Sequence, residues 1–346
     1  MPSVPEHRPL GPHVHLIVRS GLPETAGNLV TARRLAAGLA AAGIGSGILS
    51  ADALPHDAPP GPGEVVHALH ARWAGVPAVH WAQGRPVIWT FTGTDLDPDE
   101  LPALRASVGR VAACVVFHQE AADELRQTLP EAAGRVLVIP PGMEAPSGAP
   151  PAPAQANGAP VFFLPAGIRR VKNPDLAVSA VETLRQSGGA AELYIAGPRR
   201  EPSYSEDFLA RLALVPFAHY LGELPHADMP GWYARSDVVL NTSRAEGLSN
   251  AVLEAMAMGR AVLASDIAGN RAAIRHGVTG WLAAPDALPS AAVRLAADAG
   301  LRARLGRAAA EEVRRRFSPE AEVAAHLRLY AEAVAPAGRP RTPKDD

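Results

Sequence analysis

Short apolar runs alternate with longer helical segments along this chain, and the whole alternation occurs twice. In the first half the apolar runs are residues 13–20, 64–70, 86–93, 111–117 and 135–142, with helical segments such as 25–43 and 118–129 between them. The pattern stops at residues 143–160, which are rich in proline, alanine and glycine, and restarts with runs at 160–167, 191–197, 218–224, 237–243, 261–266 and 280–285. Strands and helices in alternation are typical of parallel sheets covered on both faces. The sequence therefore predicts an α/β protein with two Rossmann-like domains.

The repetition sets the expected domain boundaries, and the length of 346 residues suits two domains of about 150 residues each. We expect a disordered N-terminus (1–12), a first Rossmann-like domain (13–145), a linker (146–160), a second Rossmann-like domain (161–317), a helix that packs back across the domains (318–335) and a disordered tail (336–346). Two such domains usually close a cleft, and ligands bind at the carboxyl ends of the strands.

Composition excludes several classes of protein. The net charge of −2 argues against nucleic acid as a partner. No apolar stretch reaches the length of a transmembrane segment, and the first residues do not resemble a signal peptide. The single cysteine, Cys114, cannot form a disulfide within the chain and is expected to be a small core residue. These features favour a cytoplasmic location.

One segment combines a strand, a glycine-containing turn and a helix start. In residues 244–259, RAEGLSNAVLEAMAMG, the predicted helix has Ser249 or Asn250 as its N-cap and Gly259 just beyond its end. A helix N-terminus has unpaired N–H groups and a partial positive charge, and Gly247 allows a ligand close to the backbone. This arrangement predicts an anion site of the kind that binds a diphosphate.

Two glutamates flank this helix start, with Glu246 just ahead of the helix and Glu254 one turn inside it. A buried carboxylate without partners is costly, so Glu254 would need hydrogen-bond donors, and the adjacent hydroxyls of a sugar supply two. The spacing alone leaves a second interpretation open, in which Glu254 is a partly exposed helix residue that faces solvent.

Residues 246–282 closely resemble the donor-binding segment of the family 4 glycosyltransferases, which are retaining enzymes of the GT-B fold. The resemblance covers nearly the whole chain, less tightly in the first half. It implies that Glu254 binds the ribose hydroxyls of a nucleotide-sugar and that Glu246 faces the donor sugar. The residues whose backbone would face the sugar and phosphates are Gly247, Leu248, Ser249 and Asn250.

The same family has an arginine and a lysine that neutralise the leaving diphosphate, and residues 165–181 resemble that element. Lys172 fits the lysine. We assign the arginine to Arg169, with Arg170 as the competing candidate. The chain has only two lysines, Lys172 and Lys344, among 33 basic residues, so a lysine in this loop modestly supports a phosphate-binding role over a solvated loop charge.

Two turns in the first half resemble family elements near the donor phosphates and the acceptor. Gly27 and Asn28 lie in a glycine turn before a helix, which is also compatible with an ordinary strand–helix connection. The turn TFTGTDL resembles the family's T-F-H-G-T-D, with Thr92 where relatives have a histidine that helps to position the sugar. Thr94 and Asp95 are candidates for contacts with sugar or acceptor hydroxyls, and the alternative for Asp95 is a helix or turn cap.

The motifs GNLVTARR, LHAR, TGTD and IRRVK resemble one branch, which includes glycosyltransferase 1 domain-containing protein 1 and the selenosugar synthases of selenoneine biosynthesis. The synthases transfer a sugar from a UDP-sugar to selenophosphate. A small anionic acceptor would suit a cleft containing Arg33, Arg34 or Arg72. The nearby tryptophans, Trp73, Trp81 and Trp89, are expected in the core, with an acceptor platform as the alternative, and His67 and His70 are expected as core histidines.

These observations predict a metal-independent, retaining glycosyltransferase that uses a UDP-sugar such as UDP-GlcNAc and a soluble acceptor. We expect no cofactor, because no cysteine–histidine cluster suggests zinc and Arg169, Lys172 and the helix dipole would neutralise the diphosphate. The first-half helices lack a lysine-rich amphipathic face, which disfavours a lipid acceptor but leaves peripheral membrane contact open. The alternatives are transfer to selenophosphate or another small anion, and a non-catalytic nucleotide-sugar-binding protein.

Overall fold

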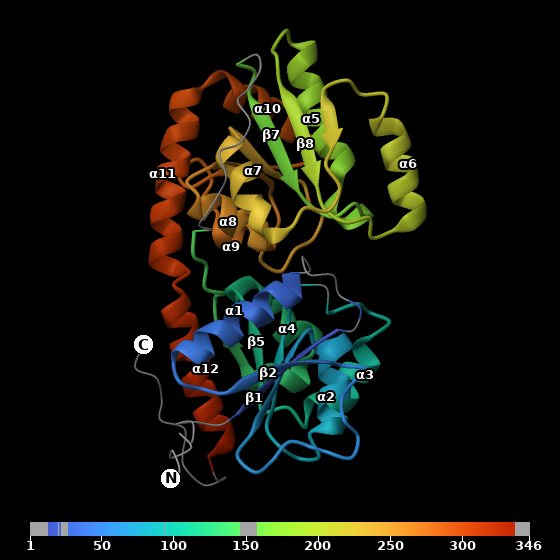
Figure 1. The fold of residues 1–346 in the computed structure, drawn as a ribbon, viewed down its shortest axis with the longest axis vertical. Coiled ribbons are helices and arrows are strands. Elements are labelled where there is room, and N and C mark those ends of the chain that lie inside the picture. The colour runs from blue at the N-terminus through green and yellow to red at the C-terminus, as the bar shows by residue number, and fades with distance from the viewer. Residues whose placement is uncertain (1–12, 20, 22–26, 94, 146–157, 336–346) are drawn as a thin grey trace, which may run out of the picture. The chain divides into compact units, whose positions relative to one another are not determined.

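The computed structural model describes residues 13–19, 21, 27–93, 95–145 and 158–335. The predicted disordered ends, most of the predicted linker at 146–160 and the candidate residue Thr94 lie outside these residues. The chain divides into two compact units (Figure 1). The first unit comprises residues 1–139 and 320–346, and the second comprises residues 140–319.

The first unit contains a six-stranded parallel sheet in the order β2-β1-β3-β4-β5-β6. Its strands are β1 (Val14–Val18), β2 (Ser46–Ser50), β3 (Val65–Leu69), β4 (Val87–Thr90), β5 (Ala113–Val116) and β6 (Val136–Val138). Five of them coincide with predicted apolar runs. β2 has the sequence SGILS and lies at the sheet edge with every residue partly exposed, so it lacks the apolar signal of a buried strand.

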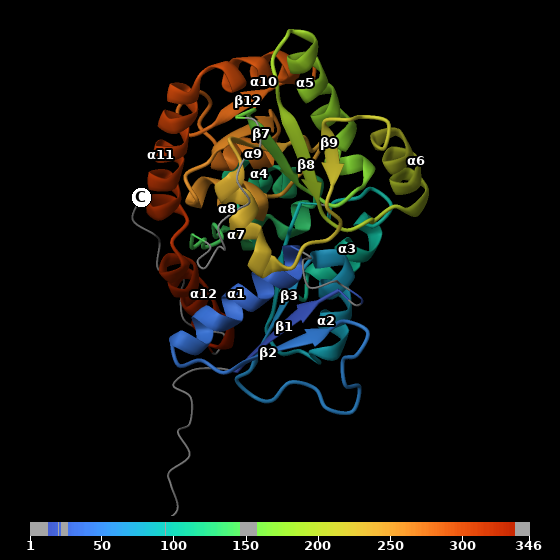
Figure 2. The same ribbon diagram turned by 45° about the horizontal axis from the view of Figure 1, so that its top comes forward.

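Helices cover both faces of this sheet, as Figure 2 shows. Leu16 of β1 packs with α1 (Gly27–Ala41) and α12 (Pro319–Val334). Ile17 points to the opposite face, because successive strand residues alternate, and packs in the core that α2 (Val76–Trp81), α3 (Leu101–Val108) and α4 (Gln119–Thr128) help to form. Cys114 is buried in that same core, as predicted. The C-terminal helix α12 thus contributes Val323, Leu329 and Tyr330 to the core of the first unit.

The second unit also contains a six-stranded parallel sheet, in the order β12-β11-β10-β7-β8-β9. Its strands are β7 (Val161–Pro165), β8 (Glu192–Ala196), β9 (Ala218–Tyr220), β10 (Val238–Asn241), β11 (Ala261–Ser265) and β12 (Trp281–Ala283). All six coincide with predicted runs. The prediction of an α/β fold with two parallel sheets is confirmed.

Neighbouring phenylalanines in β7 point to opposite faces of this second sheet. Phe162 packs in the core with α5 (Pro174–Gln186), α6 (Pro202–Leu212) and α10 (Leu288–Ala297), whereas Phe163 contacts two aromatic rings of α7 (Met229–Arg235). The helices α8 (Asn250–Ala257) and α9 (Ala268–Ala273) follow β10 and β11, and α11 (Ala299–Arg316) packs along α8 (Figure 1). Among the described residues, no helix has the length and apolar character needed to cross a membrane.

Candidate functional site

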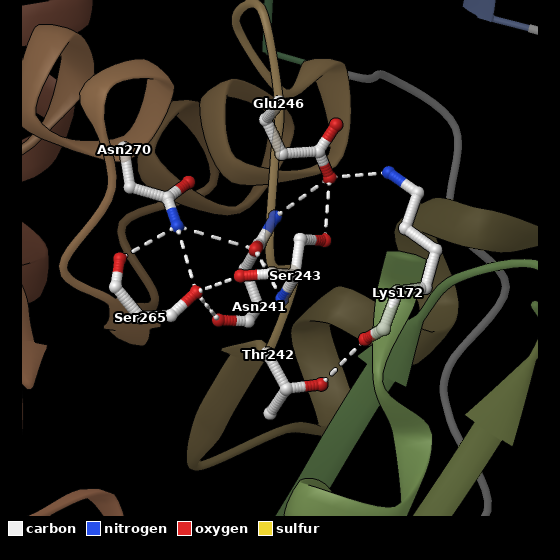
Figure 3. Close-up of polar contacts among 7 residues, drawn as sticks. All are labelled: Lys172, Asn241, Thr242, Ser243, Glu246, Ser265 and Asn270. Atoms are coloured by element: carbon white, nitrogen blue, oxygen red, sulfur yellow. Dashed lines mark hydrogen bonds and ion pairs between the residues drawn. The ribbon is translucent and has the colours of Figure 1, made fainter. Parts of the chain in front are cut away.

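Two loops of the second unit meet where β7 and β10 end. These strands are neighbours in the sheet, so their carboxyl ends lie at the same edge. Hydrogen bonds join the loops: Thr242 Oγ1 donates to the Lys172 carbonyl over 2.9 Å, and the Arg244 N–H donates to the Val171 carbonyl over 2.8 Å. The fold thereby brings Lys172 next to Glu246, which lies 74 residues further along the chain (Figure 3).

Glu246 accepts several hydrogen bonds on one carboxylate oxygen. Lys172 Nζ forms an ion pair with Oε1, Ser243 Oγ donates to the same atom over 2.7 Å, and Asn241 Nδ2 donates over 3.4 Å. Burial raises the pKa of Glu246, but the charge and hydrogen bond of Lys172, with help from Ser243 and Arg169, lower that pKa below its ordinary value. The carboxylate is therefore ionised at neutral pH.

A buried polar network lies beside this pair, on the left in Figure 3, and contacts Glu246 through Asn241 and Ser243. Asn270 of α9 is 0% exposed, and its Nδ2 donates to Asn241 Oδ1 over 3.2 Å and to the Ser265 carbonyl over 2.9 Å. Ser265 Oγ donates to the Ser243 carbonyl over 2.5 Å. None of the network's residues was among the predicted site residues. The available signal was polar residues at the ends of the apolar runs VVLNTS and AVLASD.

The structure separates the two competing arginines. Arg170 is exposed, pairs with Glu201 at 3.7 Å and has its guanidinium carbon 5.0 Å from the Tyr204 ring centre. Arg169 is partly buried, and its charge contributes to the lowered pKa of Glu246. Within the described part of the chain Arg169 forms no ion pair. The electrostatic effect of Arg169 on Glu246 therefore favours Arg169 over Arg170 as the arginine that acts with Lys172.

The loop after Glu246 leads directly into α8. Ser249 is the N-cap, yet its side chain forms no capping hydrogen bond, and the first turn of α8 contains no acidic residue. Leu248 is buried. The helix ends in a Schellman motif, in which Gly259 has φ +66° and the Arg260 N–H donates to the Ala255 carbonyl over 2.9 Å. The predicted N-cap and C-terminal glycine are confirmed.

The backbone of this loop rests against α9 at Gly269. A Cβ atom at Gly269 would overlap the carbonyl oxygens of Glu246 and Gly247. Only a glycine therefore allows α9 to approach the loop this closely. The contact fixes the backbone between the Glu246 side chain and the start of α8.

Glu254 lies on the buried side of α8, with 7% of its surface exposed. Its Oε2 accepts a hydrogen bond of 2.7 Å from the hydroxyl of Tyr233 in α7. Burial and the charge of Glu254 raise the pKa of Tyr233 well above its ordinary value, so the phenol stays protonated and donates. The interpretation of Glu254 as a solvent-facing helix residue is wrong, and sequence reasoning missed Tyr233 as its donor.

Asp95 of the first unit is 2% exposed and caps two loops. Its Oδ2 accepts from the Thr92 and Gly93 N–H groups over 2.6 and 3.0 Å, and its Oδ1 accepts from the Ala71 N–H over 2.6 Å. The structure therefore places Asp95 in the turn-capping role, joining the loops after β3 and β4.

The other first-unit candidates have different surroundings. Gly27 and Asn28 form the start of α1, exposed and partly exposed respectively. Arg34 of α1 pairs with the buried Glu322 of α12 at 3.3 Å, so Glu322 neutralises its charge inside the unit.

Three aspartates alternate with other residues at 95–99, but Asp97 and Asp99 are exposed while Asp95 is buried. Within the described residues, no group of three or more acidic, histidine or cysteine side chains is placed to hold a metal ion.

Part of the second unit matches the model of a known protein family. The family described as "Glycosyl transferases group 1" matches residues 159–298. A glycosyltransferase 1 domain-containing protein 1 of Xenopus tropicalis is 34% identical over 122 residues, which are 35% of each chain. A D-inositol 3-phosphate glycosyltransferase of Kribbella flavida is 28% identical over 72% of this chain and 64% of its own length. The chain thus matches about a third to two thirds of these relatives' length.

Solved structures show a similar fold over nearly the whole chain. Sucrose-phosphate synthase of Thermosynechococcus elongatus has a TM-score of 0.78 at 18% identity, covering 93% of this chain and 98% of its own. HepE of Anabaena, solved with UDP-glucose, has a TM-score of 0.70 at 18% identity, covering 93% and 99%. The chain thus has the GT-B fold, and its residues 159–298 are similar to the glycosyl transferases group 1 family.

Proposed function

We propose that this protein is a retaining, metal-independent glycosyltransferase whose second unit binds a UDP-sugar. The observation that carries the proposal is the placement of Lys172, Glu246 and Glu254 around the start of α8. This is a charged, partly buried site at the carboxyl ends of parallel strands, where ligands bind in such folds. The UDP-glucose complex of HepE, which has a similar fold, supports a uridine nucleotide as the donor.

In this proposal the protein acts mainly through electrostatics. The bond between the donor sugar's anomeric carbon and the diphosphate breaks, and the acceptor bonds to the same carbon on the same face. Lys172, Arg169 and the N-terminus of α8 stabilise the negative charge that develops on the departing UDP. A donor phosphate oxygen takes the acceptor's proton, so a separate base is not needed. Glu254 binds the ribose hydroxyls, and Tyr233 holds its carboxylate in place.

For the acceptor, we propose a soluble molecule that carries a small anionic group. The support comes from the relatives named D-inositol 3-phosphate glycosyltransferase and from the resemblance to selenosugar synthases. A protein that binds nucleotide-sugars without catalysis would share the donor site, and turnover separates the two.

The test is a thermal-shift screen of UDP-, GDP- and ADP-sugars that starts with UDP-glucose and UDP-GlcNAc. We expect the melting temperature to rise with uridine nucleotides, since a ligand that binds only the folded state stabilises it. Mass spectrometry then follows sugar transfer to phosphate-bearing acceptors and donor hydrolysis. No shift with any nucleotide-sugar would reject the donor site, whereas binding without transfer or hydrolysis would favour the non-catalytic protein.

A further inference from the structure

A second set of charged side chains lies at the carboxyl ends of β1 and β3, which are neighbours in the first unit's sheet. Arg19 follows β1, and Trp73 lies in the single helical turn Ala71–Gly75 that follows β3. The guanidinium carbon of Arg19 lies 3.9 Å from the centre of the Trp73 ring. Trp73 is 41% exposed, so the expectation of core packing, which holds for Trp81 and Trp89, is wrong for Trp73.

The turn that carries Trp73 is held firmly. The Ala71 N–H donates to Asp95, and the Trp73 N–H donates to His70 Nδ1 over 3.3 Å. His70 itself has φ +105°, a strained conformation for a non-glycine residue. At the end of the turn, a Cβ atom on Gly75 would lie 2.5 Å from the indole nitrogen of the buried Trp89. These contacts hold the backbone that carries the exposed indole, and the indole lies against the Arg19 guanidinium.

Arg19 differs from the other charged residues of this cluster. Arg72 forms an ion pair with Glu100, and His70 lies 3.1 Å from the buried carboxylate of Asp95. Arg19 is exposed and forms no ion pair with any described residue. Stacking on an indole uses the flat face of a guanidinium and leaves its N–H groups pointing outward in the plane. Arg19 is thus an oriented positive charge that no carboxylate among the described residues balances.

We propose that Arg19, oriented by Trp73, binds the phosphate-like oxyanion of the acceptor. The in-plane N–H groups of a guanidinium match two oxygens of a tetrahedral oxyanion, which a compact ammonium cannot do. The proposal rests on the proposed function, because only a glycosyltransferase would use this anion as part of its acceptor. The proposal names Arg19 as the residue that binds the acceptor's anionic group. Arg34 is not assigned this role, because Glu322 neutralises its charge.

The experiment measures the binding of inorganic phosphate and of glycerol 3-phosphate by calorimetry in the presence of saturating UDP. UDP occupies the diphosphate site, so an anion bound under these conditions lies elsewhere. The variants are Arg19→Ala, Arg19→Lys and Trp73→Leu, with Arg126→Ala as the matched control, because Arg126 is an arginine on α4 of the same unit that pairs with Asp123. The affinity of each variant for UDP reports the donor site independently.

We expect Arg19→Ala to weaken anion binding by about tenfold or more, as loss of a charge-assisted bidentate contact does. Arg19→Lys and Trp73→Leu should give intermediate losses, and Arg126→Ala should bind like the parent protein. Tighter binding of glycerol 3-phosphate would identify a phosphomonoester, and equal binding a free oxyanion. Unchanged anion affinity in Arg19→Ala, with UDP binding intact, would overturn this inference alone. Failure of the parent protein to bind UDP would overturn the proposed function instead.

Discussion

Lys172 forms an ion pair with Glu246, so Lys172 has two roles in the proposed reaction. It holds the Glu246 carboxylate beside Ser243, and it supplies positive charge to the departing diphosphate. A diphosphate that enters the site would share the ammonium group with Glu246. The sequence predicted both residues but not their contact, because the loops that carry them meet only in the folded sheet.

Replacement of Lys172 by alanine should reduce turnover far more than it reduces stability. We expect kcat to fall by about 100-fold, the size of effect seen when one transition-state contact is removed. The matched control is Arg170→Ala, because Arg170 is an exposed neighbour paired with Glu201 and should leave kcat within about threefold of the parent. Donor hydrolysis or transfer followed by mass spectrometry measures kcat. Equal losses in both variants would contradict the role of Lys172.

Substitutions of Glu254 and of Tyr233 can distinguish a role in ribose binding from a role in stability. Glu254→Ala removes the acceptor of the buried Tyr233 hydroxyl and should lower the free energy of unfolding by about 1–3 kcal/mol. It should also weaken UDP binding by about tenfold or more if the carboxylate binds the ribose.

Tyr233→Phe is the control for this test. It breaks the same hydrogen bond but keeps the carboxylate, so we expect a stability loss with most of the UDP affinity retained. Calorimetric titration with UDP and urea unfolding measure the two quantities. If Tyr233→Phe loses as much UDP affinity as Glu254→Ala, the effect is structural and the ribose role is rejected.

Among the elements, α8 and α9 together shape the proposed donor site. The sequence predicts the start and end of α8, because Ser249 and Gly259 are local signals of helix boundaries. It does not predict that α9 supports the loop ahead of α8, since the contact at Gly269 depends on packing between β10 and β11. The sequence did not predict β2, because its residues SGILS carry little apolar signal. Pairing with the neighbouring strand, rather than its own sequence, gives β2 its conformation.

Gly269→Ala should displace the loop that carries Glu246 and Gly247. The new Cβ would overlap two backbone carbonyl oxygens, and backbone atoms cannot move aside as a flexible side chain can. We expect a loss of about 1–3 kcal/mol in the free energy of unfolding together with weaker UDP binding. Gly109→Ala is the control, because a Cβ there meets no atom within 4 Å and the backbone φ is −60°. Equal UDP affinity in the two variants would show that the loop tolerates the displacement.

At the scale of the whole molecule, the sequence predicted the site residues of the second unit better than those of the first. The family match covers residues 159–298, which lie in the second unit, and the predicted donor residues all lie there. In the first unit, Asp95 turned out to be a loop cap and Trp73 to be exposed, because both depend on how the loops after β3 and β4 pack together. The position of α12 in the core of that unit likewise depends on contacts between residues far apart in sequence.

The packing of α12 against β3 makes the stability of the first unit depend on pH. His67 of β3 is completely buried, with its Nδ1 2.7 Å from the Tyr330 hydroxyl of α12 and its Nε2 2.7 Å from Thr90 Oγ1. His326 of α12 lies beside it, with ring centres 5.3 Å apart. Burial lowers the pKa of both histidines, and their mutual repulsion lowers that of His67 further.

Acidification should therefore loosen α12. Both histidines are neutral in the folded chain, whereas the unfolded chain takes up protons below its ordinary histidine pKa of about 6.5. The unfolded state then binds more protons, so the free energy of unfolding falls as the pH drops from 7 towards 5, by up to about 1.4 kcal/mol per pH unit for each histidine. Urea unfolding at several pH values measures this slope. His326→Gln should make the dependence of the unfolding free energy on pH less steep. His226→Gln is the control, because His226 is exposed, and it should leave this slope unchanged. Equal slopes in the two variants would mean that the buried pair does not control the acid sensitivity.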